Sequence, residues 1–357
     1  AAFGPTVILL AAAGAVATWA GWSMADRMGL AGIDRAADAV ATSAAGGDLL
    51  LPGAPPAGQL AGPAGTWPHW LVTVVPPVVA DLLRLISLPF RPTATLEQLG
   101  GAAARLGWFV LVWSIFGTAI TRHVALKLVG EDAPGIIGAT WFGSRKWLPA
   151  FNSVLFVLVG VLALSVPGAI IGLAMRSEWG LAFAGAVWPL VLLGAVVLAI
   201  LVIGVAAGWP LMVACIGVER GDSFQAISTA FSYLYQRPLR YAFYALVAVL
   251  VAIPTLLVAG LFARAAADLA MWAASLGMGH DRTATVLAGL QAAGPAADAW
   301  GVRAIGFWIR GLETLLASFG WGYFWSIATA AYLLLRQDVD GTELDEVVID
   351  EPAGQPA

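Results

Sequence analysis

The feature that most constrains this chain is a run of 38 residues, 181–218, that contains no charged side chain. As one helix it would be about 57 Å long at 1.5 Å per residue, whereas about 20 apolar residues already cross ~30 Å of hydrocarbon. Trp188–Pro189 and Trp209–Pro210 stand 21 positions apart within it. Because Trp favours the headgroup boundary, we expect one crossing between these pairs. Two short spans are the alternative, and they would invert the topology of everything downstream.

Composition extends this conclusion to the whole chain, which is 60% hydrophobic and only 11% charged. Soluble domains carry about 25% charged residues. We therefore predict an all-α fold, a polytopic transmembrane helical bundle with about six spans, interfacial amphipathic helices and a weak tandem repeat of two spans. The five further spans are expected at residues 6–24, 106–120 (extending toward 127), 150–174, 239–262 and 314–335. No basic residue precedes the first of them, which favours a true span over a signal-peptide core.

The expected spans divide the chain into six parts. They are a first transmembrane helix (1–24), an extracytoplasmic loop with an interfacial helix (25–104), a four-span core (105–262), an extracytoplasmic helical loop (263–304), a last transmembrane helix (305–336) and an acidic tail (337–357). Ala, Gly and Pro dominate residues 25–66, which is typical of an extended loop. Residues 67–92 contain a double proline together with Asp81 and Arg84, which favour a helix lying in the interface over a crossing.

Three landmarks suggest that the core is a tandem repeat, with copies at about 105–174 and 181–262. Glu131 and Glu219 are 88 residues apart, Pro149 and Pro238 are 89 apart, and Pro167 and Pro254 are 87 apart. In each copy a span should end in an acidic turn, and an amphipathic segment should run to a proline before a new span begins. Two spans per copy would give both copies the same orientation. Chance placement of prolines in an apolar background is the competing interpretation.

Basic residues predict the orientation. Seven of the 18 lie in the two segments that join the second span to the third and the fourth to the fifth: Arg122, Lys127, Arg145, Lys146, Arg220, Arg237 and Arg240. The positive-inside rule places these segments in the cytoplasm. The C-terminus, where seven of the 22 acidic residues lie within the last twenty positions, should share that side. We expect a multi-pass protein of a bacterial inner (cytoplasmic) membrane.

The segment "FSYLYQRPLRY" at 231–241 raises the question of what it binds. Asp222 and Gln225 form a capping-box pattern that starts a helix, and Phe224, Ile227, Phe231 and Leu234 fall on one predicted face. Two arginines are too few for nucleic acid, where binding neutralises many phosphates, so the membrane interface is the expected partner. The residues predicted to anchor the chain there are Trp188, Trp209, Phe231, Tyr233, Tyr235, Arg237, Arg240, Tyr241, Arg145, Lys146 and Trp147.

Small residues predict where helices pack closely. In the last span they recur every four positions, and the fourth span carries a shorter pair; the set is Ser318, Gly322, Ser326, Ala330, Gly204 and Gly208. Such stripes let another helix approach. Packing within the chain is the default expectation, and packing against another protein is the alternative.

Catalytic, metal and cofactor motifs are not found in the sequence. There is one cysteine, Cys215, and the three histidines are far apart. Aligning Gly341 with the glycine of a calcium-binding EF-hand loop puts Arg336 and Val347 at positions that require acidic ligands, so we expect no metal and no cofactor. The central parts of the predicted spans lack ionisable residues, which usually mark ion pathways.

The segments "AFSYLYQRPLRY" and "YLLLRQDVDGTELDEV" resemble those of an uncharacterised group of bacterial multi-span inner-membrane proteins, over about residues 105–350. The resemblance implies an inner-membrane protein and no particular reaction. We therefore expect a non-enzymatic scaffold or accessory subunit of a larger membrane assembly, with the lipid bilayer and other membrane subunits as partners. A transporter or lipid-handling permease built on the two repeats is the alternative.

Overall fold

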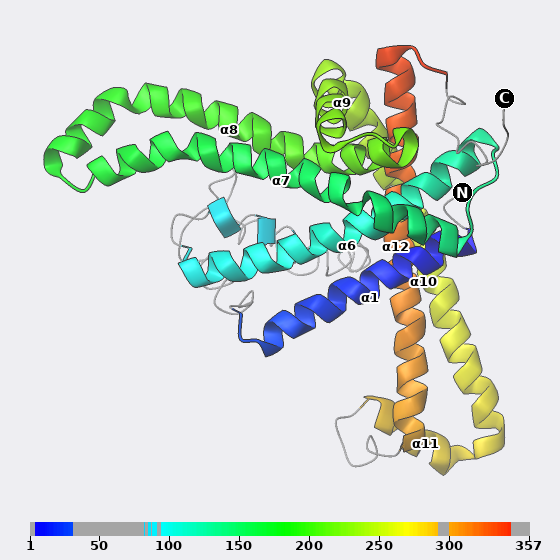
Figure 1. The fold of residues 1–357 in the computed structure, drawn as a ribbon. Helices are drawn as coiled ribbons and strands as arrows, with labels where there is room; N and C mark the ends of the chain where they lie inside the picture. Colours follow the sequence, from blue (N-terminus) through cyan, green and yellow to red (C-terminus); the bar gives the residue numbers. More distant parts are fainter. Residues whose placement is uncertain are drawn as a thin grey trace. The chain divides into compact units, whose positions relative to one another are not determined.

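The structure is a computed structural model, and it describes residues 4–30, 82, 85–86, 88–90, 94–291 and 300–343. These residues form helices and turns and contain no strand, which confirms the all-α prediction. The helices are α1 (Pro5–Arg27), a short 3-10 helix (Leu88–Phe90), α6 (Leu96–Val129), α7 (Ile136–Ala174), α8 (Glu178–Glu219), α9 (Ser223–Gln236), α10 (Pro238–Met278), α11 (His280–Gln291) and α12 (Trp300–Asp340), as Figure 1 shows.

Five of these helices are long and apolar enough to cross a membrane: α1, α6, α7, α8 and α10. The chain is therefore a helical membrane protein. The sixth predicted span, 314–335, lies in α12, which is not among these candidates within the described residues. Its many Trp, Tyr, Ser and Gly residues lower the hydropathy of a segment that is otherwise long enough.

Two of the predicted spans belong to longer helices. The apolar run 181–218 is part of α8, one uninterrupted helix of 42 residues that contains Pro189 and Pro210. Helix α10 continues to Met278, 16 residues beyond the predicted end at 262 and well into the region predicted as a loop, 263–304. It ends before Gly279, whose φ of 77° places it in the left-handed region that glycine tolerates. Most of the predicted interfacial helix at 67–92 lies outside the described residues.

The two proposed repeats differ at their central prolines. Pro238 is the first residue of α10, following a break at Arg237, as the sequence predicts. Pro149 instead lies inside α7, which runs without interruption from Ile136 to Ala174, so the prediction that it ends a helix is wrong. Helices of membrane proteins tolerate an internal proline when neighbouring groups compensate for the lost hydrogen bond.

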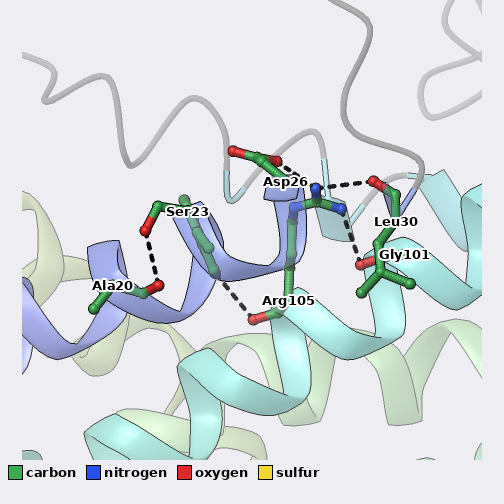
Figure 2. Close-up of polar contacts among 7 residues, drawn as sticks. Ala20, Ser23, Asp26, Leu30, Gly101 and Arg105 are labelled. Carbon is green, nitrogen blue, oxygen red and sulfur yellow. Dashed lines mark hydrogen bonds and ion pairs between the residues drawn. The ribbon is translucent and has the colours of Figure 1, made fainter. Parts of the chain in front are cut away.

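The described chain divides into two compact units, and each is described by itself. Unit 2 comprises residues 15–109 and 253–317, and its clearest interhelical contact joins α1 to α6 through Arg105 (Figure 2). The buried guanidinium of Arg105 donates to the Asp26 carboxylate at 2.6 Å and to the carbonyl oxygens of Leu30 and Gly101, both at 3.3 Å. The Trp22 indole donates to the Arg105 carbonyl oxygen at 3.1 Å. These bonds hold the C-terminal turn of α1 beside the start of α6.

Unit 1 comprises residues 1–14, 110–252 and 318–357, and three glycines set the close approach of its helices. A Cβ at Gly143 of α7 or at Gly217 of α8 would lie closer than 3.0 Å to atoms of α6, and one at Gly117 of α6 would meet the Trp325 ring of α12. The ring of Trp325 also lies 5.9 Å from that of Trp113 and 5.4 Å from that of Trp209, measured between ring centroids. Helix α6 is therefore the centre of this unit, with α7, α8 and α12 packed on it.

Helices α7 and α8 run side by side as a hairpin (Figure 1). Ser177 caps the start of α8 by accepting a hydrogen bond from the Gly180 amide at 3.1 Å. Gly180 is required there because a Cβ would clash with the Ala174 carbonyl oxygen. Away from α6 and α9, almost every side chain of the hairpin is exposed: only 11% of the most apolar window of each helix is buried.

Candidate functional site

Several of the interhelical polar contacts of unit 1 lie around the C-terminal end of α8. The centre is the Glu219 cluster, which we define as Glu219, Tyr332, Arg336, Gln225 and Cys215. The Glu219 carboxylate accepts hydrogen bonds from the Tyr332 hydroxyl and from Gln225 Nε2, the latter at 2.8 Å, and Arg336 Nε lies 3.3 Å from it. Cys215 Sγ lies 4.0 Å from the same carboxylate. The cluster thus joins three helices, α8, α9 and α12.

The last turn of α12 is tied to α9 and α10 by two further carboxylates. Asp340 accepts a hydrogen bond from the buried Tyr233 hydroxyl, and burial together with this bond raises the pKa of that phenol. Asp338 accepts from Tyr244 at 3.0 Å and pairs with Arg240. The hydrogen bond from Arg240 holds the pKa of the Asp338 carboxyl below its usual range, so this contact persists at mildly acidic pH.

Cations gather on the other side of the same α8 end, in what we call the basic corner: Arg122, Arg145, Lys146 and Arg220, with the rings of Trp141 and Phe142. Lys146 Nζ donates to the Arg220 carbonyl oxygen at 2.6 Å. Arg122 Nη1 lies 3.5 Å from the carbonyl oxygens of Gly217 and Val218. These donors satisfy carbonyls that have no intrahelical partner, where a helix carries partial negative charge.

Two aromatic rings organise the basic corner. The guanidinium carbons of Arg122 and Arg220 lie 5.3 and 5.5 Å from the centroid of the Phe142 ring, and that of Arg145 lies 4.9 Å from the Trp141 ring. Arg220 itself has φ of 62°, the one positive φ among the described non-glycine residues. Its left-handed conformation ends α8 and lets Asp222 cap α9, with the Asp222 carboxylate accepting from the Gln225 amide at 2.8 Å.

The predicted anchoring residues divide into exposed and packed groups. Trp188 is exposed, as are Arg145, Arg237 and Arg240, whereas Tyr241 donates to the Ala207 carbonyl oxygen at 2.7 Å. Tyr233 is only 1% exposed, so its predicted role at the lipid interface is wrong. Its ring lies against that of Tyr332 in the interior, with the centroids 5.6 Å apart. Of the remaining predicted anchors, Tyr235 is exposed and Lys146, Trp147, Trp209 and Phe231 are half-buried.

Helix α9 begins and ends as predicted, and the side that packs on the protein is formed mainly by residues outside the apolar face assigned to the membrane interface, of which only Leu234 is buried. Ser223, Ala226, Ala230 and Tyr233 are buried, whereas Phe224 is 68% exposed and stacks on Phe156, with 5.1 Å between the ring centroids. Small side chains on the inner face allow α9 to approach α8 so closely that a Cβ at Gly204 would clash with the Phe231 ring. Packing against α8, rather than hydrophobicity alone, therefore sets the orientation of α9.

The predicted packing residues of α12 contact other helices of the same unit. Ser318, Gly322 and Ser326 are buried, and a Cβ at Gly322 would lie 3.0 Å from Val7 of α1. Gly204 and Gly208 of α8 lie against α9, while Ala330 is half-buried. The sequence signal did not indicate Tyr332 and Arg336 as partners of Glu219, because residues more than 100 positions apart share no local pattern.

The described residues include no group of three or more His, Cys, Asp or Glu side chains able to hold a metal ion. The Nδ1 atom of His123 in α6 lies 2.8 Å from the Pro134 carbonyl oxygen. The other two histidines, His69 and His280, are far from it in the sequence. Comparison with known proteins adds no analogy, since no family model, no curated protein and no solved structure matches the chain. Two polar features of unit 1 therefore stand out. The Glu219 cluster joins three helices, and the basic corner concentrates positive charge at the C-terminal end of α8.

Proposed function

We propose that this protein is a non-enzymatic scaffold or accessory subunit of a larger membrane assembly, and that the α7–α8 hairpin is its contact surface. The observation that supports the proposal is that most of the apolar surface of this hairpin is not covered by the rest of the chain. Both helices are long and apolar, yet only 11% of the most apolar window of each is buried by the rest of the chain. Helix α6 has half of its corresponding window buried and α10 has none, so exposure alone does not single out the hairpin, and the glycines of α7 are what point to it.

Exposed glycines favour a protein partner over lipid alone. Gly160, Gly168 and Gly172 are spaced by multiples of four along α7, and a Cβ at any of them would meet nothing within 4 Å. Glycine inside a helix costs about 0.5–1 kcal/mol relative to alanine. Lipid tails recover none of this cost, but a second helix packed against a small-residue face does. The glycines at Gly143 and Gly217, where α6 approaches closely, illustrate the same use within the chain.

The permease alternative lacks such support. It would be favoured by a polar cavity near Asn152 and the two kink prolines, Pro167 and Pro254. In the described part of the chain, the side chains that follow Asn152 toward Pro167 are mostly exposed leucines and valines, and Ser165 returns its hydroxyl to the Leu162 carbonyl oxygen of its own helix. We therefore keep the scaffold as the proposed function.

Leucine at Gly168 and Gly172 should remove the partner and leave the chain intact. The added side chains enter open space in this chain but would block a close helix. Native mass spectrometry of the protein, extracted gently from its own membrane, should show a second polypeptide at fixed stoichiometry with the wild type and none with Gly168→Leu/Gly172→Leu. Ala163→Leu, on another exposed face of α7, is the control and should retain it. A wild-type chain that is always alone would reject the scaffold proposal.

We also propose that the membrane is the bacterial inner membrane, with the α8–α9 turn and the C-terminus in the cytoplasm. Basic residues near the adjoining ends of α6 and α7 (Arg122, Lys127, Arg145, Lys146) and from the end of α8 to the start of α10 (Arg220, Arg237, Arg240) support this orientation. Cysteines introduced by Glu178→Cys and Glu343→Cys should report it, because the native Cys215 is fully buried. A membrane-impermeant thiol reagent should label position 178 and spare position 343 in intact cells. Labelling of position 343 would reverse the orientation.

A further inference from the structure

We infer that the basic corner binds the phosphate headgroup of an anionic lipid, with Arg145 and Lys146 as the phosphate-binding cations. This inference goes beyond the scaffold proposal and holds for the single chain. Two pairs of residues near the start of α7 support the inference, and the members of each pair are four positions apart. Trp141 and Arg145 are four apart and exposed, while Phe142 and Lys146, also four apart, turn toward the end of α8.

Trp141 and Arg145 together suit a position at the membrane surface. Trp141 is 61% exposed and the Arg145 guanidinium lies 4.9 Å from its ring. An indole prefers the headgroup level, where it meets both apolar chains and water. A guanidinium on its face is oriented by the ring while its fork of N–H donors stays available for a phosphate. Trp141 thus sets the depth of this turn in the membrane, and Arg145 supplies N–H donors directed at a lipid phosphate.

Lys146 brings a second cation to the same edge. Its ammonium has three donors, and one reaches the Arg220 carbonyl oxygen at 2.6 Å. This bond holds the side chain beside the α8–α9 turn, next to Arg145 along α7. Arg220 and Arg122 flank the Phe142 ring behind it and add positive potential. Of the carboxylates at this end of α8, Glu219 hydrogen-bonds Tyr332 and Gln225 and pairs with Arg336. Asp222, in the α8–α9 turn, is the carboxylate that interacts with the Lys146 charge, and it caps α9 by accepting a hydrogen bond from the Gln225 amide.

The alternative role for these cations is to neutralise the C-terminal end of α8. That role accounts for Arg122 and Lys146, which reach α8 carbonyl oxygens. It does not account for Arg145, whose described contact is with the exposed face of Trp141. Nor does it require an aromatic ring at the outer edge. A phosphate diester anchored by its acyl chains alongside α7 uses both features, because the apolar surface of α7 continues directly from this turn.

The experiment titrates the full chain in neutral detergent with phosphatidylglycerol and, separately, with phosphatidylcholine, and counts bound lipid by native mass spectrometry. The wild type should bind phosphatidylglycerol in preference. One cation near an anionic surface is worth about fivefold in binding. Arg145→Gln should therefore weaken phosphatidylglycerol about fivefold, and Arg145→Gln/Lys146→Gln about 25-fold. Binding of phosphatidylcholine should not change.

Two controls keep the result interpretable. Arg176→Gln removes an exposed arginine of the same unit just beyond the C-terminal end of α7, the end opposite Arg145, and should leave phosphatidylglycerol binding within twofold of the wild type. The thermal unfolding of Arg145→Gln should match that of the wild type, because this side chain is exposed. Equal binding of the two lipids by the wild type, or no loss with Arg145→Gln, would overturn the inference. Displacement of phosphatidylglycerol by millimolar inorganic phosphate would also overturn it, since free phosphate and not a lipid would then be the ligand.

Discussion

Gly143→Ala is expected to destabilise the protein by about 2–3 kcal/mol, the upper part of the range for overpacking a core. The added methyl group would lie closer than 3.0 Å to the Ile115 carbonyl oxygen and 3.1 Å from the Ala119 Cβ. A flexible side chain could move away from such a clash, but the backbone of α6 can yield only if the two helices separate. Thermal unfolding or SDS titration in detergent would measure the loss.

Gly168→Ala is the matched control on the same helix. Nothing lies within 4 Å of its added methyl group, so only the helix preference of alanine remains, which stabilises by up to about 1 kcal/mol. The two substitutions therefore make the same chemical change and should have opposite signs. Equal effects at the two positions would show that α7 does not pack on α6 through Gly143.

Glu219→Ala should destabilise unit 1 by about 3 kcal/mol. Removing one partner of a buried ion pair typically costs 3–5 kcal/mol, and the lower end applies because the Glu219 and Arg336 side chains retain 17% and 14% of their exposure. The substitution removes the carboxylate that lies 3.3 Å from Arg336 Nε and also removes the acceptor of the Tyr332 and Gln225 hydrogen bonds. Denaturation of the purified wild type and variant would measure this difference in the free energy of unfolding.

A double-mutant cycle of Glu219→Ala with Arg336→Met separates the free-energy contribution of the ion pair from that of the lost Tyr332 and Gln225 hydrogen bonds. Contacting residues show coupling free energies of about 0.5–3 kcal/mol, so the double variant should be less destabilised than the sum of the single ones. Glu343→Gln, an exposed carboxylate just beyond α12, is the control and should change stability by less than about 0.5 kcal/mol. Additive effects of the two cluster substitutions would mean that Glu219 and Arg336 do not interact.

The sequence predicted the class of protein because apolar length is a local property. The charge-free run of α8 is long enough to cross a membrane whatever surrounds it, and three of the four small residues in the stripe of α12, Ser318, Gly322 and Ser326, are buried. The cap at Asp222 and the start of α10 at Pro238 were equally readable, since caps and prolines act within a few residues.

Features that depend on a second helix could not be predicted in this way. Gly143 and Gly168 occupy the same helix and look alike in the sequence, but only Gly143 meets a backbone carbonyl. The buried face of α9 follows the surface of α8, which no periodicity within α9 encodes. The partner of Glu219 was missed for the same reason. Its hydrogen-bond donors on α12 come from a segment whose own pattern indicates only a span.

The Glu219 cluster has a consequence for biosynthesis. Tyr332 follows Glu219 by 113 residues, and chains grow at roughly 5–20 residues per second. At these rates the carboxylate at the end of α8 lacks two of its three donors for about 6–23 s, although α7 and α9 have already been synthesised. Unit 1 can close only when the final helix arrives. The insertion machinery must hold an open intermediate for that time, and a chain that terminates before Tyr332 carries an unmatched charge by which quality-control proteases can recognise it.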